Sequence, residues 1–383
     1  MSVEAKPKAG LEDVVAGESS ICFLDGARGV LAYHGYDIHD LANAERGASF
    51  EEVCFLLWHA RLPSRAELGD LQTQLVASLT LPDQVLRAMR NLPKVDGMDA
   101  LRTLTSILGH YDPDANERSP QANYRKAVRL TGQISALVAA WGRVAAGGNP
   151  IDPNPALGHA ANFLYMLTGA RPSELAARAF DVALILHADH ELNASTFAAR
   201  VSAATLTDIH STIVGAIGAL KGPLHGGANA DVMRLLLEIG RDAGPDRAEE
   251  FIRERLERKD KVPGFGHRVY RTEDPRATHL RRLSQALGEK AGQPQWYEMS
   301  RRIEALVLKD KKLYPNVDFY SASMYYVMGI AIDLYTPIFA VSRISGWTAH
   351  VLEQYSNNRL IRPRTDYIGP PYPQQFVPLA ARG

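Results

Sequence analysis

Three segments of the sequence place titratable side chains among glycines and prolines, where the packing of helices alone does not require them. The first is GPLHGGAN at residues 222–229, in which a proline and three glycines surround His225. This composition favours a tight turn ahead of a helix, where the positive end of the helix dipole disfavours a protonated imidazole. A neutral imidazole there can donate a hydrogen bond to a carbonyl that is becoming an enolate. The alternative is a turn histidine without a role.

The second segment is VPGFGHRVYRTEDPR at residues 262–276, where Arg271 and Arg276 follow His267 beyond a glycine-rich loop. Guanidinium groups bind carboxylates and phosphates as planar forks with two parallel hydrogen bonds. The segment therefore indicates a site for an anionic ligand, although a basic surface loop would have the same composition.

The third segment is YPNVDFYS at residues 314–321, which places Asp318 just before an apolar helix. An aspartate in that position can cap the N-terminus of the helix. It can also act as a general base, provided that it lies close to the carbon acid and is shielded from water. The sequence leaves both roles open.

A fourth segment, HADHELNAS at residues 187–195, carries His187 and His190 three residues apart, as on one face of a helix end. The HExxH spacing of zinc sites is absent and the segment offers no evident third ligand, so we expect no metal. A metal-dependent lyase built on these histidines is the alternative, and a chelator would test it.

The rest of the pattern predicts the elements that must hold these segments. Two short runs, residues 20–24 and 30–33, flank a turn at Asp25 and Gly26 and predict a small hairpin. Beyond it the apolar residues recur at helical spacing, with capping-box sequences at residues 49–52 and 64–67. We expect an all-α fold with helices over residues 99–110, 121–146, 156–168, 173–187, 196–220, 230–240, 246–258, 274–287, 296–308, 321–335 and 337–355.

Length and charge limit the classes of function. With 383 residues the chain exceeds the usual size of one core, so we expect two domains that share a cleft. Its 43 basic and 43 acidic residues balance, which argues against binding a nucleic acid.

The apolar stretch 322–341 is interrupted by Asp333 and Pro337, so it is a poor membrane span. The start MSVEAKPKAG has no apolar core typical of a signal peptide. Cys22 and Cys54 lie among apolar residues, which predicts buried thiols in a reducing compartment. We therefore expect a cytoplasmic protein.

Taken in order, these segments resemble the citrate synthase family. GFGHRVYRTEDPR at residues 264–276 is close to that family's signature, and the likeness extends from residues 24–36 through the four segments to the C-terminal VSR and RP. The resemblance implies a two-domain helical fold with a small N-terminal β-hairpin. Residues 1–221 and 321–383 would form a large domain, and residues 222–320 an inserted small domain that binds the acyl-CoA. One departure is His34, where family members often carry arginine; it affects no assigned residue.

The resemblance also implies a role for each site residue. Asp318 would remove a proton from the acetyl group, His225 would hydrogen-bond the thioester oxygen, and His267 would polarise the ketone of oxaloacetate. Oxaloacetate would be bound by His190, Arg276, Arg343 and Arg362, the last reaching the site of the partner subunit in a homodimer. Contacts to CoA would come from Arg271, Lys261, Gly264, Phe265 and Gly266. No metal and no permanently bound cofactor is implied, since the acyl-CoA is a co-substrate.

Two other functions remain open at this point. A 2-methylcitrate synthase would use propionyl-CoA, and the one extra methylene changes discrimination by only about 1–3 kcal/mol, so these motifs do not decide between the two thioesters. A helical CoA-binding protein without activity would be expected to lack His225, His267 or Asp318, and all three are present.

Overall fold

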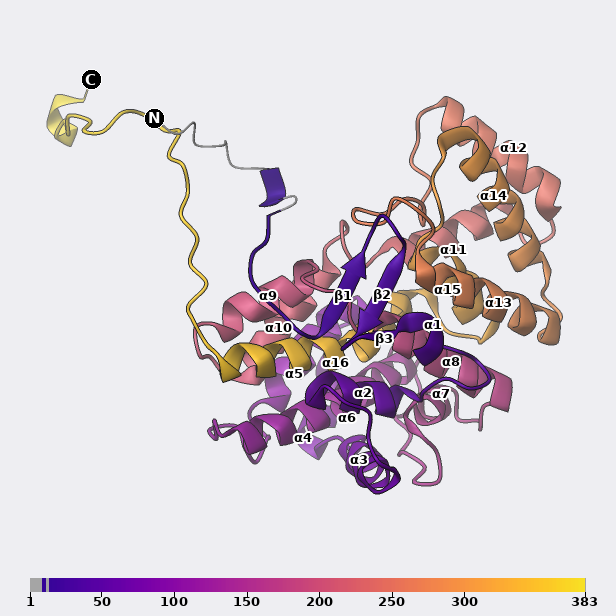
Figure 1. Cartoon of the computed structure of the whole chain (residues 1–383), viewed down its shortest axis with the longest axis horizontal. Helices are drawn as coiled ribbons and strands as arrows, with labels where there is room; N and C mark the ends of the chain where they lie inside the picture. The colour runs from indigo at the N-terminus through magenta and orange to yellow at the C-terminus, as the bar shows by residue number, and fades with distance from the viewer. Residues whose placement is uncertain (1–8, 12–13, 383) are drawn as a thin grey trace.

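The computed structural model describes residues 9–11 and 14–382, and Figure 1 shows a mostly helical chain with a small N-terminal sheet. The first eight residues of MSVEAKPKAG, on which the signal-peptide expectation rests, lie outside the described residues. Among the described residues, no helix is both long and apolar enough to cross a membrane.

The sheet confirms the predicted hairpin and adds one strand. Strands β1 (Cys22–Asp25), β2 (Val30–Tyr33) and β3 (Tyr36–Asp37) pair antiparallel in that order, with Cys22 opposite Tyr33. Oδ1 of Asp25 accepts the backbone N–H groups of Ala27 and Arg28, both at 3.0 Å, and so closes the β1–β2 turn. This is the local chemistry that makes aspartate a turn residue.

Eleven of the α-helices in the described residues form the main body. Capping boxes at Ser49 and Ser64 start two of them, as the sequence predicts. The eleven are α1 (Ile38–Leu41), α2 (Phe50–His59), α3 (Arg65–Ser78), α4 (Asp83–Asn91), α5 (Gly97–Leu108), α6 (Pro120–Ala145), α7 (His159–Thr168), α8 (Glu174–His187), α9 (Ala194–Ala203), α10 (Ile209–Lys221) and α16 (Tyr335–Ser356).

Helix α16 runs through the centre of this body. It packs against α2, α5, α6, α8, α9 and α10, and all but one of residues 335–351 are buried. A helix that is buried on every side belongs to a core, so polar side chains on it need partners. Its first turn follows a short 3₁₀ turn, η2 (Ile332–Leu334).

The remaining helices gather beside the body, in the upper right of Figure 1. They are α11 (Ala228–Ile239), α12 (Gly244–Glu257), α13 (Pro275–Lys290), α14 (Gln295–Lys311) and α15 (Val317–Val327). Helix α15 packs against both α11 and α13, and α13 also contacts α8 of the body. The expected domain boundary between residues 320 and 321 falls inside α15, and the division into two domains stays a prediction.

Two helices predicted from the sequence differ from those observed. The run 196–220 is two helices, because Leu206 has φ 61° and the Asp208 carboxylate starts α10 by accepting the Ser211 N–H at 2.9 Å. The helix expected over 321–335 begins earlier, at Val317, and ends at Val327 before Gly329 at φ 76°. Helix propensity alone does not locate such breaks; capping residues do.

The C-terminal segment, residues 357–382, leaves the end of α16 and runs away from the body as an extended chain (Figure 1). It contains only a short 3₁₀ turn, η3 (Leu379–Ala381), comparable with η1 (Ala9–Leu11) near the other end of the described chain. Several of its large apolar side chains are exposed, among them Tyr367, Ile368 and Phe376.

Candidate active site

The sequence segments that carry chemistry meet between the two groups of helices. His190 lies in the α8–α9 turn, His225 in the α10–α11 turn and His267 in the loop before α13. The charge of buried Arg343 on α16 acts on His190, His225 and Asp318, and the charge of buried Arg276 acts on His190, His267 and Asp318. Six residues from six elements therefore share one electrostatic environment.

Asp318 does not cap α15; the cap is Asn316, whose Oδ1 accepts the Asp318 N–H at 3.0 Å. The capping role that the sequence left open is therefore wrong. Oδ1 of Asp318 is buried and has no hydrogen-bond partner among the described residues. Burial, strengthened by the nearby Asp274 carboxylate and opposed by Arg276 and Arg343, raises the pKa of Asp318 to about 7. Such a carboxylate is suited to take up a proton near neutral pH.

His267 is held as a hydrogen-bond donor. Its Nδ1 accepts the backbone N–H groups of Val269 at 3.0 Å and Tyr270 at 3.1 Å, so the ring proton lies on Nε2. Burial, together with the charge of Arg276, lowers the pKa of His267 to about 4. The ring is therefore neutral at physiological pH, and its Nε2–H, which has no hydrogen-bond partner in the described part of the chain, can donate to a ligand.

His225 has the opposite tautomer. Its Nε2 accepts the Ser195 N–H at 3.3 Å and lies 2.8 Å from Ser195 Oγ, which leaves the proton on Nδ1. Oγ of Ser195 is itself fixed by Asn193 Oδ1 at 2.8 Å and by the Trp347 indole N–H at 3.1 Å. Burial and the charge of Arg343 lower the pKa of His225 to about 4.

The turn that carries His225 requires glycine. A Cβ on Gly226 would lie 2.4 Å from the carbonyl oxygen of Leu220, closer than side chains approach backbone. The chain turns here directly after α10 and enters α11 at Ala228. The predicted placement of His225 ahead of a helix N-terminus is thus observed.

The two buried arginines differ in how their charge is balanced. Arg276 donates to both oxygens of Asp274, at 2.9 and 2.8 Å, and Asp274 also caps α13. Arg343 donates Nε to the carbonyl of His187 at 2.7 Å and lies over the ring of Phe339. No carboxylate of the described residues lies within ion-pair distance of Arg343, although it is 1% exposed. Burial lowers the pKa of Arg343 to about 10, and the same burial makes an anionic ligand favourable.

His190 completes this group. It is buried, its Nε2 lies 3.2 Å from the hydroxyl of Tyr270, and its ring centre is 5.1 Å from that of His267. Burial and the charge of Arg276 lower the pKa of His190 well below the usual value. His187 points elsewhere, because its Nδ1 donates to Ala183 O at 2.7 Å. Within the described part of the chain, no group of three His, Cys, Asp or Glu side chains is arranged to hold a metal ion.

The glycine loop that precedes His267 is bonded to the start of α15. Gly264 O accepts the Asn316 N–H at 2.9 Å, Gly266 N–H donates to Tyr314 O at 2.9 Å, and Asn316 Nδ2 donates to Gly266 O at 3.0 Å. Both glycines have left-handed φ, 80° and 78°. A Cβ on Gly264 would lie 2.7 Å from Val232 Cγ2. The loop, including the half-buried Phe265, therefore shares a rigid frame with Asp318.

Three sequence-predicted residues lie on the surface instead. The side chains of Lys261 and Arg271 are exposed, although the Arg271 N–H donates to Gly26 O at 2.9 Å and so ties this loop to the β1–β2 turn. Arg362 is exposed, and it belongs to the C-terminal segment that runs away from the body in Figure 1.

Sequence reasoning missed the residues that hold the site side chains: Ser195, Trp347 and Tyr270, which support the histidines, and Asp274, which binds Arg276. Ser195, Tyr270 and Asp274 stand within the segments that carry the candidate site residues, but nothing in their spacing shows which of those residues each one contacts. Trp347 follows Arg343 by one helical turn, a spacing that puts both on one face of α16.

Comparison with known proteins finds relatives that match nearly the whole chain. A family model, the citrate synthase C-terminal domain, matches residues 10–364. Citrate synthase 2 of Bacillus subtilis is 54% identical over 97% of this chain and 98% of its own length. Citrate synthase of Haloferax volcanii is 52% identical over 94% and 96%, and 2-methylcitrate synthase of Shewanella oneidensis is 42% identical over 98% of both.

Solved structures of citrate synthases have a fold similar to that of this chain. The crystal structure of citrate synthase from Pyrobaculum aerophilum superposes with a TM-score of 0.89 at 43% identity, covering 97% of this chain and 95% of that one. A ternary complex of carboxymethyl coenzyme A and oxaloacetate with the enzyme from Thermoplasma acidophilum gives a TM-score of 0.88 at 32% identity, covering 97% and 98%.

Proposed function

The chain belongs to the citrate synthase family, a family of acyltransferases, and on this premise we propose that it condenses acetyl-CoA with oxaloacetate and water to give citrate and free CoA. The observation that carries the proposal is Arg343, a buried guanidinium without a carboxylate partner in the described residues, beside His190 and Arg276. Oxaloacetate carries two carboxylates, and buried guanidinium groups hold such an anion most strongly when they bind it as a fork.

The first step forms the nucleophile. Asp318 accepts a proton from the methyl carbon of the acetyl thioester, while the Nδ1–H of His225 donates to the thioester oxygen. The C–H electron pair becomes the carbon–carbon double bond while the Nδ1 proton of His225 passes to the thioester oxygen, which gives the enol. His225 takes this proton back when the thioester carbonyl forms again in the second step. A base and an oxygen-facing donor acting together lower the barrier, because neither a free carbanion nor a free oxyanion has to form.

The second step forms the new carbon–carbon bond. The enol carbon attacks the ketone carbon of oxaloacetate, and the Nε2–H of His267 donates to the ketone oxygen as its charge develops. Water then hydrolyses the citryl thioester, which releases citrate and the thiol of CoA. The opposite tautomers of the two histidines suit these two different oxygens.

Acetyl-CoA is the preferred thioester in this proposal. The citrate synthases of Bacillus subtilis and Haloferax volcanii are 54% and 52% identical to this chain, whereas the 2-methylcitrate synthase of Shewanella oneidensis is 42% identical. We expect free-thiol release from acetyl-CoA only when oxaloacetate is present, with a higher kcat/KM than for propionyl-CoA. A higher kcat/KM with propionyl-CoA would make methylcitrate the product, and no release from either thioester would remove the proposed reaction.

We also propose that Arg362 completes the oxaloacetate site of a partner subunit in a homodimer. Its exposure on a segment that runs away from its own body supports this placement. The exposed Lys261 and Arg271 are proposed to contact CoA phosphates, together with the loop Gly264, Phe265 and Gly266. A cytoplasmic location is proposed from the free cysteines Cys22 and Cys54.

The shared site predicts complementation between two inactive variants. Arg362→Ala and Asp318→Asn subunits, refolded together, are expected to regain activity, because one of the two sites in each heterodimer then has both native residues. Activity would be measured as CoA release, after separation of heterodimers by two different affinity tags. Verified heterodimers without activity would show that each site uses residues of one chain only.

A further inference from the structure

The turn that presents His190 is held by the carboxylate of the residue before it. Oδ2 of Asp189 accepts the Glu191 N–H at 3.2 Å, and Glu191 has a left-handed φ of 52°. A residue with a side chain stays in this conformation only where its surroundings impose it. The backbone of Asp189 is fixed as well, since its N–H and C=O both bond the hydroxyl of buried Tyr33. Asp189 thus sets the chain on both sides of His190.

The carboxylate of Asp189 is in turn held by His350 of α16. Nε2 of His350 lies 3.2 Å from Asp189 Oδ2, and Nδ1 lies 2.9 Å from Nη1 of Arg200. A guanidinium has only donors, so Nδ1 must accept and the ring proton must lie on Nε2, where it is donated to Asp189. Both Asp189 and His350 are completely buried.

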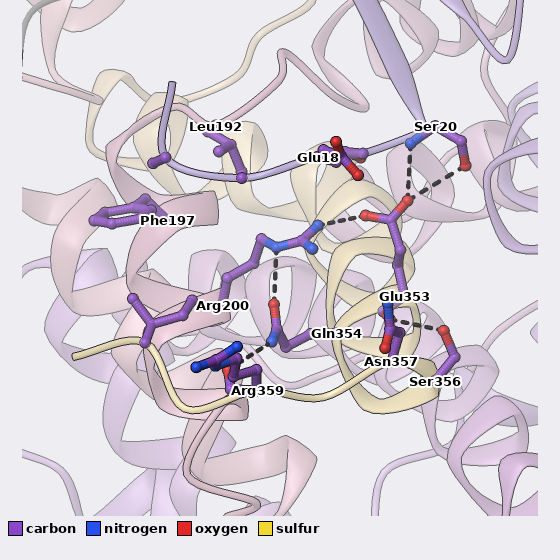
Figure 2. A pocket seen from close by; sticks show the side chains of 14 residues that line it. Glu18, Ser20, Leu192, Phe197, Arg200, Glu353, Gln354, Ser356, Asn357 and Arg359 are labelled. Carbon is purple, nitrogen blue, oxygen red and sulfur yellow. Dashed lines mark hydrogen bonds and ion pairs between the residues drawn. The ribbon is translucent and has the colours of Figure 1, made fainter. Parts of the chain in front are cut away.

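The hydrogen bonds that run from Asp189 through His350 to Arg200 continue to the wall of a cavity. Arg200 also pairs with Glu353 Oε2 and donates Nε to Gln354 Oε1 at 3.2 Å, and Glu353 Oε1 accepts the Ser20 N–H at 2.9 Å. Figure 2 shows Arg200 between Glu353 and Gln354 in this cavity of about 600 Å³, which the segment 16–20 borders. The outer residues of this hydrogen-bonded series come from α9 (Arg200), α16 (Glu353) and the N-terminal segment (Ser20). Because these three parts of the chain are bonded together, His350 and Asp189 have little freedom to move.

The face of α16 that bonds Asp189 also bonds residues next to the site histidines. Arg343, Trp347 and His350 are spaced four and three residues apart and bond the His187 carbonyl, Ser195 and Asp189. A single rigid helix thus holds the supports of both His190 and His225. Sites whose side chains are supported by such an outer layer keep the geometry that catalysis needs.

We propose that Asp189 and His350 are positioning residues for oxaloacetate: the Nε2–H of His350 holds the Asp189 carboxylate, and this carboxylate fixes the turn that presents His190. The inference rests on the proposed role of His190 in binding oxaloacetate. Neither residue is assigned contact with the substrate, so the loss of the His350 hydrogen bond acts through the placement of His190. The Asp189 carboxylate also acts by its charge on Arg343, which makes the His350 variants the cleaner test.

Two amide variants of His350 separate positioning from packing. In His350→Gln the amide nitrogen can take the place of Nε2 and still donate to Asp189. In His350→Asn the amide oxygen can take the place of Nδ1 and accept from Arg200, but the side chain is too short to reach Asp189. We expect the Asn variant to bind oxaloacetate about 10-fold or more weakly, and the Gln variant within about 3-fold of the parent, since small displacements of site groups have large effects.

The measurements are the Kd for oxaloacetate by calorimetry, KM for each substrate from CoA release, and thermal unfolding. The matched control is His210, another buried histidine, whose Nε2 lies 3.5 Å from Asp112 away from the site; its Gln and Asn variants should leave the Kd unchanged. Equal oxaloacetate affinities for His350→Asn and His350→Gln would overturn the positioning role, whatever their stabilities. If the parent protein neither binds oxaloacetate nor releases CoA from the thioester, the proposed function is refuted instead.

If the Asn variant fails to fold, Asp189→Ala decides the same question through the other partner. It removes the carboxylate that holds Glu191 N–H, and we expect weaker oxaloacetate binding with a KM for acetyl-CoA close to that of the parent. An unchanged Kd for oxaloacetate in a folded Asp189→Ala variant would overturn the proposal.

Discussion

Replacing Asp318 with asparagine is expected to lower kcat by about 10²–10⁴-fold, the usual contribution of a positioned general base. The amide has nearly the same shape, so the Asn316 cap and the start of α15 should persist. Oxaloacetate binding is expected to change little, because Asp318 acts on the thioester. The measurement is CoA release under saturating substrates, with the Kd for oxaloacetate from calorimetry.

The same substitution is expected to stabilise the free protein, and the gain should depend on pH. Burial raises the pKa of Asp318 to about 7, whereas the ordinary value is 3.8. Below pH about 4 the carboxyl is protonated in both the folded and the unfolded chain, so it has no effect on the free energy of unfolding. Between about 4 and 7 only the unfolded chain ionises freely, so stability falls as pH rises, and above 7 the full penalty is present.

Asparagine removes that penalty, so we expect the variant to be about 1–3 kcal/mol more stable than the parent at pH 8 and closer to it at pH 5. Urea unfolding at both pH values measures the difference. The control is Asp246→Asn in the first turn of α12, where the side chain is 92% exposed and should affect neither activity nor this pH dependence. Near-normal kcat in Asp318→Asn would refute the base assignment, whereas an absent stability gain would refute only the account of its pKa.

Much of the fold follows from local rules. The hairpin, the two capping boxes and most helices were predicted, because turn residues and caps act within a few residues of one another. The breaks at Leu206 and Gly329 were not predicted, since the apolar spacing continues across them. The sequence identified Asp318 as a candidate, but only the structure shows that the neighbouring Asn316 is the cap and that Asp318 Oδ1 has no hydrogen-bond partner among the described residues.

The site follows less completely from the sequence, for a physical reason. Residue types and the family resemblance identified His190, His225 and His267, but the tautomer of each ring depends on contacts that are distant in sequence. For example, Ser195 N–H bonds His225 across 30 residues and His350 bonds Asp189 across 161. The balance of charge is likewise a property of packing: Arg276 forms an ion pair with Asp274 two residues away, whereas Arg343 forms no ion pair with a carboxylate of the described residues and is reached only by the longer-range charge of Asp189.

That difference leads to a second large effect, for Arg343→Met. We expect the Kd for oxaloacetate to rise by about 30-fold to several thousand-fold, because removing one partner of a buried charge pair costs about 2–5 kcal/mol of binding. The KM for acetyl-CoA should change much less. Calorimetry with oxaloacetate and CoA-release kinetics measure the two effects separately.

Stability of the free Arg343→Met protein should tell a functional arginine from a structural one. Because Arg343 is buried without a carboxylate partner in the described residues, replacing it with an apolar side chain of similar length is expected to change the free energy of unfolding by less than about 1 kcal/mol. Arg129 is the contrast, since its guanidinium lies 2.6 Å from both Asp112 and Asp114. Arg129→Met should lose about 2–3 kcal/mol of stability and leave oxaloacetate binding intact. The reverse pattern, in which Arg343→Met unfolds readily but the folded fraction binds oxaloacetate normally, would mean that Arg343 holds α16 to α8 and that another group receives the anion.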